Sequence, residues 1–271
     1  MSEFFTEAVL IATFASAIRF AVPLLLAGLG EAYGQRSGVL NLGVDGVMLL
    51  GAFGGYYTVL KLDNVWLGLV AGLGVGLALG IISAFISVTL KAEQGISGIG
   101  IFLFGLGMSD LLFQRLVGTP RPIDTFPRLE IPLLSEIPWI GEMLFRQNLV
   151  VYLAALAIPV SMVVINRTTF GMKIRAVGEN PEAADSLGVS VAKVRYGTML
   201  IGGTLAGVAG AALAIELGIF QQNITNQQGF IAIALVYFGA WRPLGVMLGA
   251  LLYGFVNALI IQWKTLGIIS D

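Results

Sequence analysis

Long apolar stretches separated by short polar segments follow one another along almost the whole chain. The stretch from Leu67 to Leu90, for example, consists mostly of Leu, Ile, Val, Ala and Gly. A helix needs about 20 apolar residues to cross a hydrocarbon core about 30 Å thick. The pattern predicts about eight helices, of which the seventh is too short to span unaided, at residues 8–30, 39–60, 66–90, 96–117, 149–165, 196–220, 230–240 and 244–262.

The composition agrees with lipid as the solvent. Hydrophobic residues make up 57% of the 271 residues and charged residues only 11%, whereas a soluble domain has about 25% charged residues. A spanning chain must hydrogen-bond its own backbone, so it is either a helical bundle or a closed barrel. Barrel strands would be about 10 residues long with alternating polarity, which the continuous apolar runs do not match. We therefore predict an all-α polytopic integral membrane protein.

Two long loops determine the predicted topology. Residues 118–148 contain five prolines, which exclude a continuous helix and favour a loop outside the membrane. Residues 166–195 contain five Lys and Arg against three acidic residues, and such a basic excess marks cytoplasmic loops. We expect a single transmembrane domain over residues 1–271, with the N-terminus and 118–148 on the extracytoplasmic side and 166–195 in the cytoplasm.

Several glycines have the spacing of helix-packing motifs. Small residues four positions apart let helix backbones approach closely in lipid. They predict ordinary packing between membrane helices rather than a dedicated dimer face, and they are Gly72, Gly76 and Gly80 in one segment and Gly203, Gly207 and nearby Gly210 in another.

Several kinds of chemistry are excluded by the residue types present. The chain has no Cys and no His, so it has no disulfide, no Cys/His zinc site and no imidazole base. It also lacks the Gly-x-x-x-x-Gly-Lys-Ser/Thr loop that cradles nucleotide phosphates. A membrane enzyme using Asp and Ser is an alternative, but no paired-carboxylate or nucleophile motif favours it.

The predicted cytoplasmic loop contains the pattern of a short, well-capped helix. Asn180 is a suitable N-cap and Pro181 suits the first helical position. Glu182 and Asp185 lie near the positive end of the helix, and Gly188 can end it. The helix is too short to form a domain of its own.

These residues carry a resemblance to a known family. Glu182-Ala183-Ala184 followed by Gly188 resembles the EAA---G core of the loop by which permeases of ATP-binding-cassette (ABC) importers dock on their ATPase subunits. Residues 175–180, 34–46 and 229–245 are similar to permeases for branched-chain amino acids, simple sugars and nucleosides, and are closest to the nucleoside type. Together these stretches extend the resemblance over most of the chain.

The resemblance implies a type II importer-like permease bundle that moves a nucleoside or simple sugar into the cytoplasm by alternating access. The ATPase-coupling residues would be Asn180, Pro181, Glu182, Ala183, Ala184, Asp185 and Gly188, flanked by Lys173, Arg175, Lys193 and Arg195.

The implied partners are cytoplasmic ABC ATPases, a second permease chain, an extracytoplasmic solute-binding protein and the lipid of a bacterial inner membrane, with no nucleic acid. This chain would bind no cofactor and catalyse no reaction, because ATP and Mg would be held by the ATPase. Relatives usually continue past a position such as Asp271 with another helix, which suggests that this chain is truncated at its C-terminus.

Polar residues at membrane depth are costly and usually mark either a solute path or a contact between helices. We predict that Asn41, Asp45, Ser97 and Asn223 line the solute path. Asn41 has the strongest case, because glycines at 38, 43 and 46 would let that helix break and expose backbone to a water-filled cavity. Hydrogen bonding between helices is the competing explanation for each of them.

Other intramembrane charges allow a rival function. Arg19, Asp110, Arg115 and Glu216 can form structural ion pairs, but a proton or sodium relay uses the same residue types. An ion-coupled secondary transporter using Asp110 and Glu216 is therefore the main alternative. That alternative leaves the capped helix at 181–187 unexplained.

Overall fold

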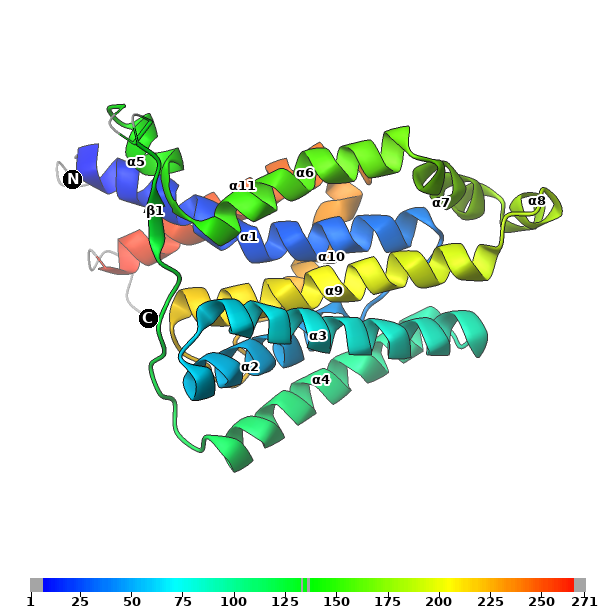
Figure 1. The fold of residues 1–271 in the computed structure, drawn as a ribbon, viewed down its shortest axis with the longest axis horizontal. Coiled ribbons are helices and arrows are strands. Elements are labelled where there is room, and N and C mark those ends of the chain that lie inside the picture. The colour runs from blue at the N-terminus through cyan, green and yellow to red at the C-terminus, as the bar shows by residue number, and fades with distance from the viewer. Residues whose placement is uncertain (1–6, 133, 136, 266–271) are drawn as a thin grey trace.

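The computed structural model describes residues 7–132, 134–135 and 137–265. Within these residues the chain is a bundle of helices that run mostly along one long axis (Figure 1). The helices are, in chain order, α1 (Glu7–Arg36), α2 (Val44–Leu62), α3 (Val65–Ala84), α4 (Gln94–Leu116), α5 (Ile140–Leu144), α6 (Leu149–Arg167), α7 (Thr169–Glu179), α8 (Pro181–Ser186), α9 (Val191–Leu217), α10 (Gln228–Phe238) and α11 (Pro243–Thr265).

Each of the eight predicted apolar segments coincides with a helix over most of its length, but their number as membrane spans is not confirmed. Six described helices are long and apolar enough to cross a membrane, namely α1, α3 with the π-helical turn that follows it, α4, α6, α9 and α11. The helix α2 is not among the six. The helix α10 has 11 residues and is too short, as its sequence predicted.

Three boundaries differ from the prediction by five residues or more, and one of them is the start of α9, at Val191 rather than at residue 196. The first helix continues past residue 30 to Arg36, because Glu31 and Gln35 pair with each other inside the protein and do not interrupt it. The second helix begins at Val44 rather than at residue 39. Gly38 has a φ of 78°, and the Asn41 side chain binds the N–H of Gly43, which turns the chain instead of continuing it as helix.

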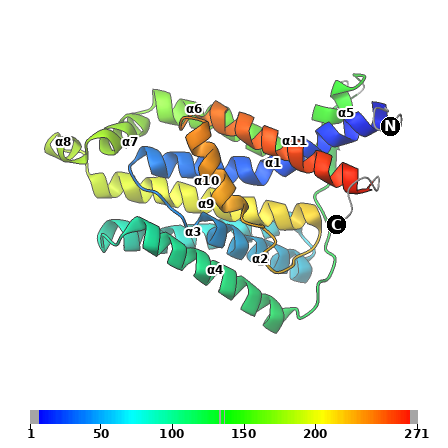
Figure 2. The same ribbon diagram turned by 180° about the vertical axis from the view of Figure 1, so that it is seen from behind.

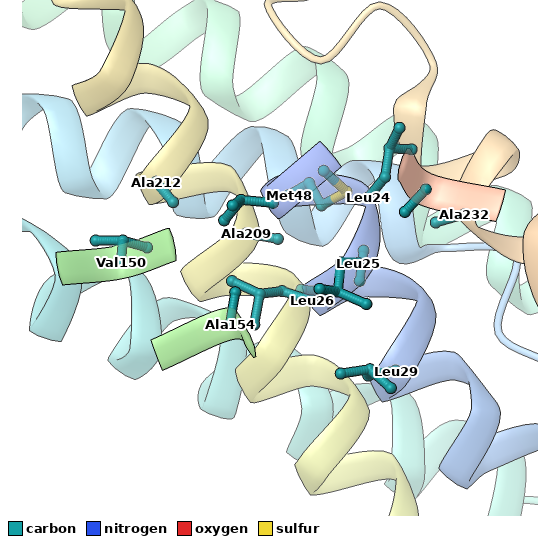
Figure 3. Packing of buried hydrophobic residues seen from close by; sticks show 14 of the residues in the cluster. Leu24, Leu25, Leu26, Leu29, Met48, Val150, Ala154, Ala209, Ala212 and Ala232 are labelled. Atoms are coloured by element: carbon teal, nitrogen blue, oxygen red, sulfur yellow. The ribbon is translucent and has the colours of Figure 1, made fainter. Parts of the chain in front are cut away.

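The core lies where α1 and α9 cross the other helices. Large side chains of α1 fill the space against small residues of α6, α9 and α10, as the cluster in Figure 3 shows. Leu24 and Leu29 of α1 are completely buried, and Ala209 of α9 belongs to the same cluster. A pair of central helices thus holds the remaining helices together.

Glycine allows α9 to lie against α3 without intervening side chains. A Cβ on Gly76 would lie 2.8 Å from the Cα of Gly207, and a Cβ on Gly203 would lie 2.6 Å from the carbonyl oxygen of Gly76. Separations this short are not tolerated by real Cβ atoms. The predicted role of these glycines in packing within the membrane is therefore confirmed.

The two ends of the bundle carry different structures (Figure 1). At one end lie α7 and α8. The opposite end carries α5 and an antiparallel pair of three-residue strands, β1 (Arg128–Glu130) and β2 (Arg146–Asn148), all within the proline-rich loop. That loop has no continuous helix, as its prolines predicted, although its strands were not predicted. The expectation about truncation concerns Asp271, which lies outside the described residues.

We predict that Gly76→Ala lowers the free energy of unfolding by about 1–3 kcal/mol, because the new methyl group overlaps the backbone of α9. Gly74→Ala is the matched control on the same helix, because nothing lies within 4 Å of its Cβ position. The control should be neutral or slightly stabilising, since Ala is the better helix former. Unfolding in SDS, followed by circular dichroism of both purified variants, measures the difference; equal stabilities would contradict the packing role.

Candidate functional site

The loop between α6 and α9 folds into two short helices with well-formed ends. At the start of α8, the Asn180 side chain accepts a hydrogen bond of 2.9 Å from the N–H of Ala183, and Pro181 occupies the first turn. After α8, Gly188 has a φ of 82°, and the N–H of Val189 returns to the carbonyl of Ala184 at 3.0 Å. The predicted cap, first-turn proline and terminating glycine are all present.

One face of α8 packs against the rest of the protein, and the opposite face is exposed. Ala184 is only 4% exposed and packs in a cluster with Ile174 of α7 and Val194 of α9. The opposite face exposes polar and apolar side chains together, including Leu187 at 83% exposed. The other exposed residues of this face are Glu182, Ala183, Asp185 and Ser186.

The helix pair is joined directly to the C-terminal end of α1. A Cβ on Gly178, near the end of α7, would overlap the carbonyl oxygen of Arg36, the last residue of α1. The side chain of Arg195 donates through Nε to the carbonyl of Ser37 at 3.3 Å, and the Ser37 hydroxyl hydrogen-bonds the Thr198 hydroxyl at 2.8 Å. The turn after α1 is therefore clamped between α7 and α9.

The predicted basic residues around this loop have different environments. Arg195 is partly buried and clamps the turn after α1. Lys173, Arg175 and Lys193 are exposed.

Residues 37–43 follow this clamp as irregular backbone that leads into α2. The N–H of Leu40 donates to the Gln94 side chain of α4 at 2.9 Å. Asn41 is 8% exposed, and its side-chain oxygen accepts from the N–H of Gly43 at 3.0 Å. The predicted break at these glycines is present, and Asn41 stabilises the turn within it.

A buried carboxylate that the sequence reasoning missed lies beside this segment. Glu31 of α1 is 2% exposed, accepts from the Gln35 side chain at 3.3 Å and also hydrogen-bonds the backbone amide of Asn41. Gln35 in turn accepts from the Trp241 indole at 2.9 Å. The available signal is its position, because Glu31 follows directly after the apolar run predicted to end at residue 30.

Asp45 ties two distant parts of the chain together. One carboxylate oxygen accepts from the N–H of Gly229 at 2.8 Å and the other accepts from the Thr225 hydroxyl at 3.0 Å. The helix α10 has no side-chain cap of its own, since Gln227 at its N-cap makes none. Asp45, on α2, therefore caps α10 from another helix and places a negative charge at its positive end.

The remaining two predicted path residues, Ser97 and Asn223, have different environments. Ser97 is in the first turn of α4 and donates to the carbonyl of Glu93 at 2.8 Å. The N–H groups of Ile96 and Gly95 donate to the Glu93 carboxylate, and these bonds hold the pKa of Glu93 below its ordinary value. Asn223 is exposed on the loop between α9 and α10 and has a φ of 52°.

The candidate ion-coupling residues have separate partners. Glu216 pairs with Arg19 at 3.3 Å and accepts from the Asn148 side chain at 2.6 Å. Asp110 accepts from the side-chain amides of Gln114 and Gln222. Arg115 forms none of the ion pairs recorded among the described residues. The expected ion pairing is thus seen for Arg19 and Glu216 alone of the four.

Comparison with known proteins identifies the family. The profile of the family described as branched-chain amino acid transport system / permease component matches residues 13–267. The chain belongs to this permease family. It is thus a permease component of a transport system, built as a multi-pass membrane protein.

Individual relatives agree with the family match. A putative glucose ABC transporter permease protein of Haloferax volcanii is 41% identical over 94% of this chain and 78% of the relative. A guanosine ABC transporter permease protein of Bacillus subtilis is 34% identical over 93% of this chain and 82% of the relative. A nucleoside ABC transporter permease protein of Lactococcus lactis is 33% identical over 91% and 81%. No solved structure matches the chain.

We predict that Asp45→Leu destabilises the permease by about 1–3 kcal/mol, because the N–H of Gly229 and the Thr225 hydroxyl lose a buried acceptor. Asp45→Asn should cost much less, since its oxygen can still accept from Gly229 and the Thr225 hydroxyl can accept from its amide. Hydrogen exchange of the first turn of α10, together with unfolding in SDS, reports both effects. Unchanged protection of the Gly229 amide in Asp45→Leu would contradict the capping role.

Proposed function

We propose that this chain is the transmembrane permease subunit of an ABC importer that moves a nucleoside or simple sugar into the cytoplasm by alternating access. The observation that carries the proposal is α8, a capped helix with one face fixed to the bundle and the other exposed. The names of the three relatives support the cargo, because they specify glucose, guanosine and nucleosides.

The contacts at the base of α8 support a mechanism for coupling. Asn180 ends α7 and begins α8, so the two short helices share a residue. Gly178 touches the end of α1, and Arg195 holds the next residue, Ser37. A displacement of α8 by an ATPase is thus passed through these contacts into residues 37–43, which lead into α2.

The proposed importer has several partners. Cytoplasmic ATPase subunits holding ATP and Mg dock on the residues from Asn180 to Gly188. An extracytoplasmic solute-binding protein delivers cargo to the loop at 118–148, and a second permease chain completes the translocation unit. The proposed location is the inner membrane of a bacterium, with α7 and α8 in the cytoplasm.

The irregular segment at 37–43 supports a place for Asn41, Asp45 and Ser97 beside the solute path. Non-helical backbone at membrane depth is tolerated where protein buries it or where it lines a water-filled cavity. In the described arrangement protein buries Asn41 and Asp45, so their contact with solute requires the opening that alternating access brings. Asn223 is exposed without such a change.

The contacts of the charged residues do not favour an ion-coupled secondary transporter. Asp110 and Glu216 bind different side chains, and neither bonds to the other. This rival also gives no role to the exposed face of α8. Uptake into proteoliposomes with and without ATP on the ATPase side separates the two functions, and uptake driven by an ion gradient alone would overturn the importer.

We predict that Leu187→Arg prevents docking of the ATPase, because a charged side chain replaces the most exposed apolar residue on the free face of α8. Leu62→Arg, at a residue 60% exposed at the end of α2, is the matched control and should leave docking intact. Co-purification of the ATPase with each variant measures docking, and ATP-driven uptake measures the consequence. Full co-purification with Leu187→Arg would place the docking surface elsewhere.

We predict that the two ends of the bundle label from opposite sides of the membrane. The chain has no Cys, so Thr125→Cys and Ser186→Cys each introduce a single thiol at an exposed position. In whole cells with a permeabilised outer membrane, an impermeant maleimide should label the thiol at 125, whereas the thiol at 186 should react only after the inner membrane is broken. The reverse pattern would invert the proposed topology.

A further inference from the structure

The segment between α9 and α10 enters the bundle as non-helical backbone. Phe220 packs against Phe53 and Tyr56 of α2, and Thr225 reaches Asp45 near the start of α2. At 1.5 Å per residue, Tyr56 and Asp45 are separated by about 16 Å along the helix axis. Residues 218–227 therefore pass along α2 for about three helical turns without forming a helix themselves.

This segment turns polar side chains outward although it lies at membrane depth. Asn223, Asn226 and Gln227 have φ values of 52°, 45° and 65°, so the backbone folds through tight turns. Lipid does not cover irregular backbone of this kind, because its unpaired polar groups would be left without partners. Water or protein must cover the exposed residues, which are Gln221, Gln222, Asn223, Asn226 and Gln227.

A carboxylate on α4 faces the same segment. Asp110 is partly exposed, and its two oxygens accept hydrogen bonds from Gln222 of the segment and from Gln114 of its own helix. Asp110 lies about 24 Å along α4 from Gln94, within the length needed to cross a hydrocarbon core about 30 Å thick. A carboxylate facing lipid within the hydrocarbon core is disfavoured, so this surface also requires water or a polar partner.

A third polar group, at the C-terminal end of the segment where α10 begins, has no hydrogen bond among the described residues. The side-chain oxygen of Gln228, the first residue of α10, is buried and has no hydrogen-bond partner among the described residues. Buried acceptors are nearly always paired with protein or with ordered water. This oxygen therefore needs an additional donor beside the same loop.

We propose that residues 221–227 and Asp110 form one wall of a water-filled path, and that Asp110 binds a neutral solute through two adjacent hydroxyl groups. This inference rests on the proposed function, because it assigns the place where the cargo is recognised. A carboxylate has about four lone-pair sites, and the amides of Gln114 and Gln222 occupy one site on each oxygen. One acceptor site remains on each oxygen, which matches the paired donors of a ribose or hexose diol.

Accessibility to water tests the path without knowledge of the cargo. Gln222→Cys and Asn226→Cys each place a single thiol on the segment, and Leu252→Cys on α11, at a residue 67% exposed, is the lipid-facing control. In the assembled complex with its ATPase, a charged methanethiosulfonate reagent should modify the two segment thiols at least tenfold faster than the control. Rates equal to the control would overturn the path, whether lipid or the second permease chain covers the surface.

Discrimination between cargoes tests the role of Asp110. ATP-driven uptake of guanosine is compared with uptake of 2′-deoxyguanosine, and uptake of D-glucose with uptake of its 2-deoxy and 3-deoxy analogues, with the binding protein unchanged. For the compound transported, Asp110→Asn should lower kcat/KM about tenfold, the effect of roughly 1.4 kcal/mol, and should affect the deoxy analogue that lacks the bound pair of hydroxyls much less. Arg115→Gln is the matched control. It alters a neighbouring exposed charge and should change the uptake of neither compound.

The outcomes separate this inference from the proposed function. ATP-dependent uptake with equal losses for both compounds in Asp110→Asn would overturn recognition by Asp110 while leaving the importer intact. Absence of any ATP-dependent uptake by the unaltered complex would overturn the importer itself, and the thiol reaction rates would still decide whether the segment faces water.

Discussion

Direct contact between helix backbones is the constraint on which this structure depends. In lipid there is little hydrophobic force to draw helices together, so close packing and backbone satisfaction must hold the bundle. The helix α9 meets this requirement by presenting glycine and alanine toward its neighbours. Gly207 contacts Gly72 and Gly76 of α3, while Gly210 meets the backbone of α2 at Met48. Because these contacts leave no room for adjustment, α2, α3 and α9 are expected to move together as a unit.

The functional surfaces lie where this regular packing ends. Residues 37–43 and 218–227 are both irregular, and both reach α2 near Asp45. The first segment is attached to α7 through Gly178 and Arg36. The second carries Gln222, whose side-chain amide donates a hydrogen bond to Asp110. A rigid central unit with two irregular segments at its margin is a suitable design for passing a displacement at one end to a site within the membrane.

The sequence predicted elements well and their tertiary roles less well. Apolar length located all eight segments, and local capping rules located the start of α8 to the residue, because both signals depend only on neighbours in the chain. Asp45 was assigned to the solute path, yet its hydrogen bonds go to Thr225 and Gly229, residues far away in sequence. Glu31 was overlooked because its partners come from a turn whose shape depends on tertiary contacts. A polar residue in an apolar run indicates a structural or functional role. Its hydrogen-bond partner in the folded protein decides which of the two roles it has.

The cap that Asp45 supplies to α10 limits which related permeases can exchange segments by recombination. A helix normally carries its own N-cap, so it can be moved between proteins with its immediate flanks. Here the cap belongs to a helix about 180 positions earlier in the chain. A chimera that exchanges the C-terminal third between two permeases would carry α10 away from its acceptor unless both parents have a carboxylate at the equivalent position. Recombination within this fold is thereby restricted to parents that share the pair, whatever their cargoes.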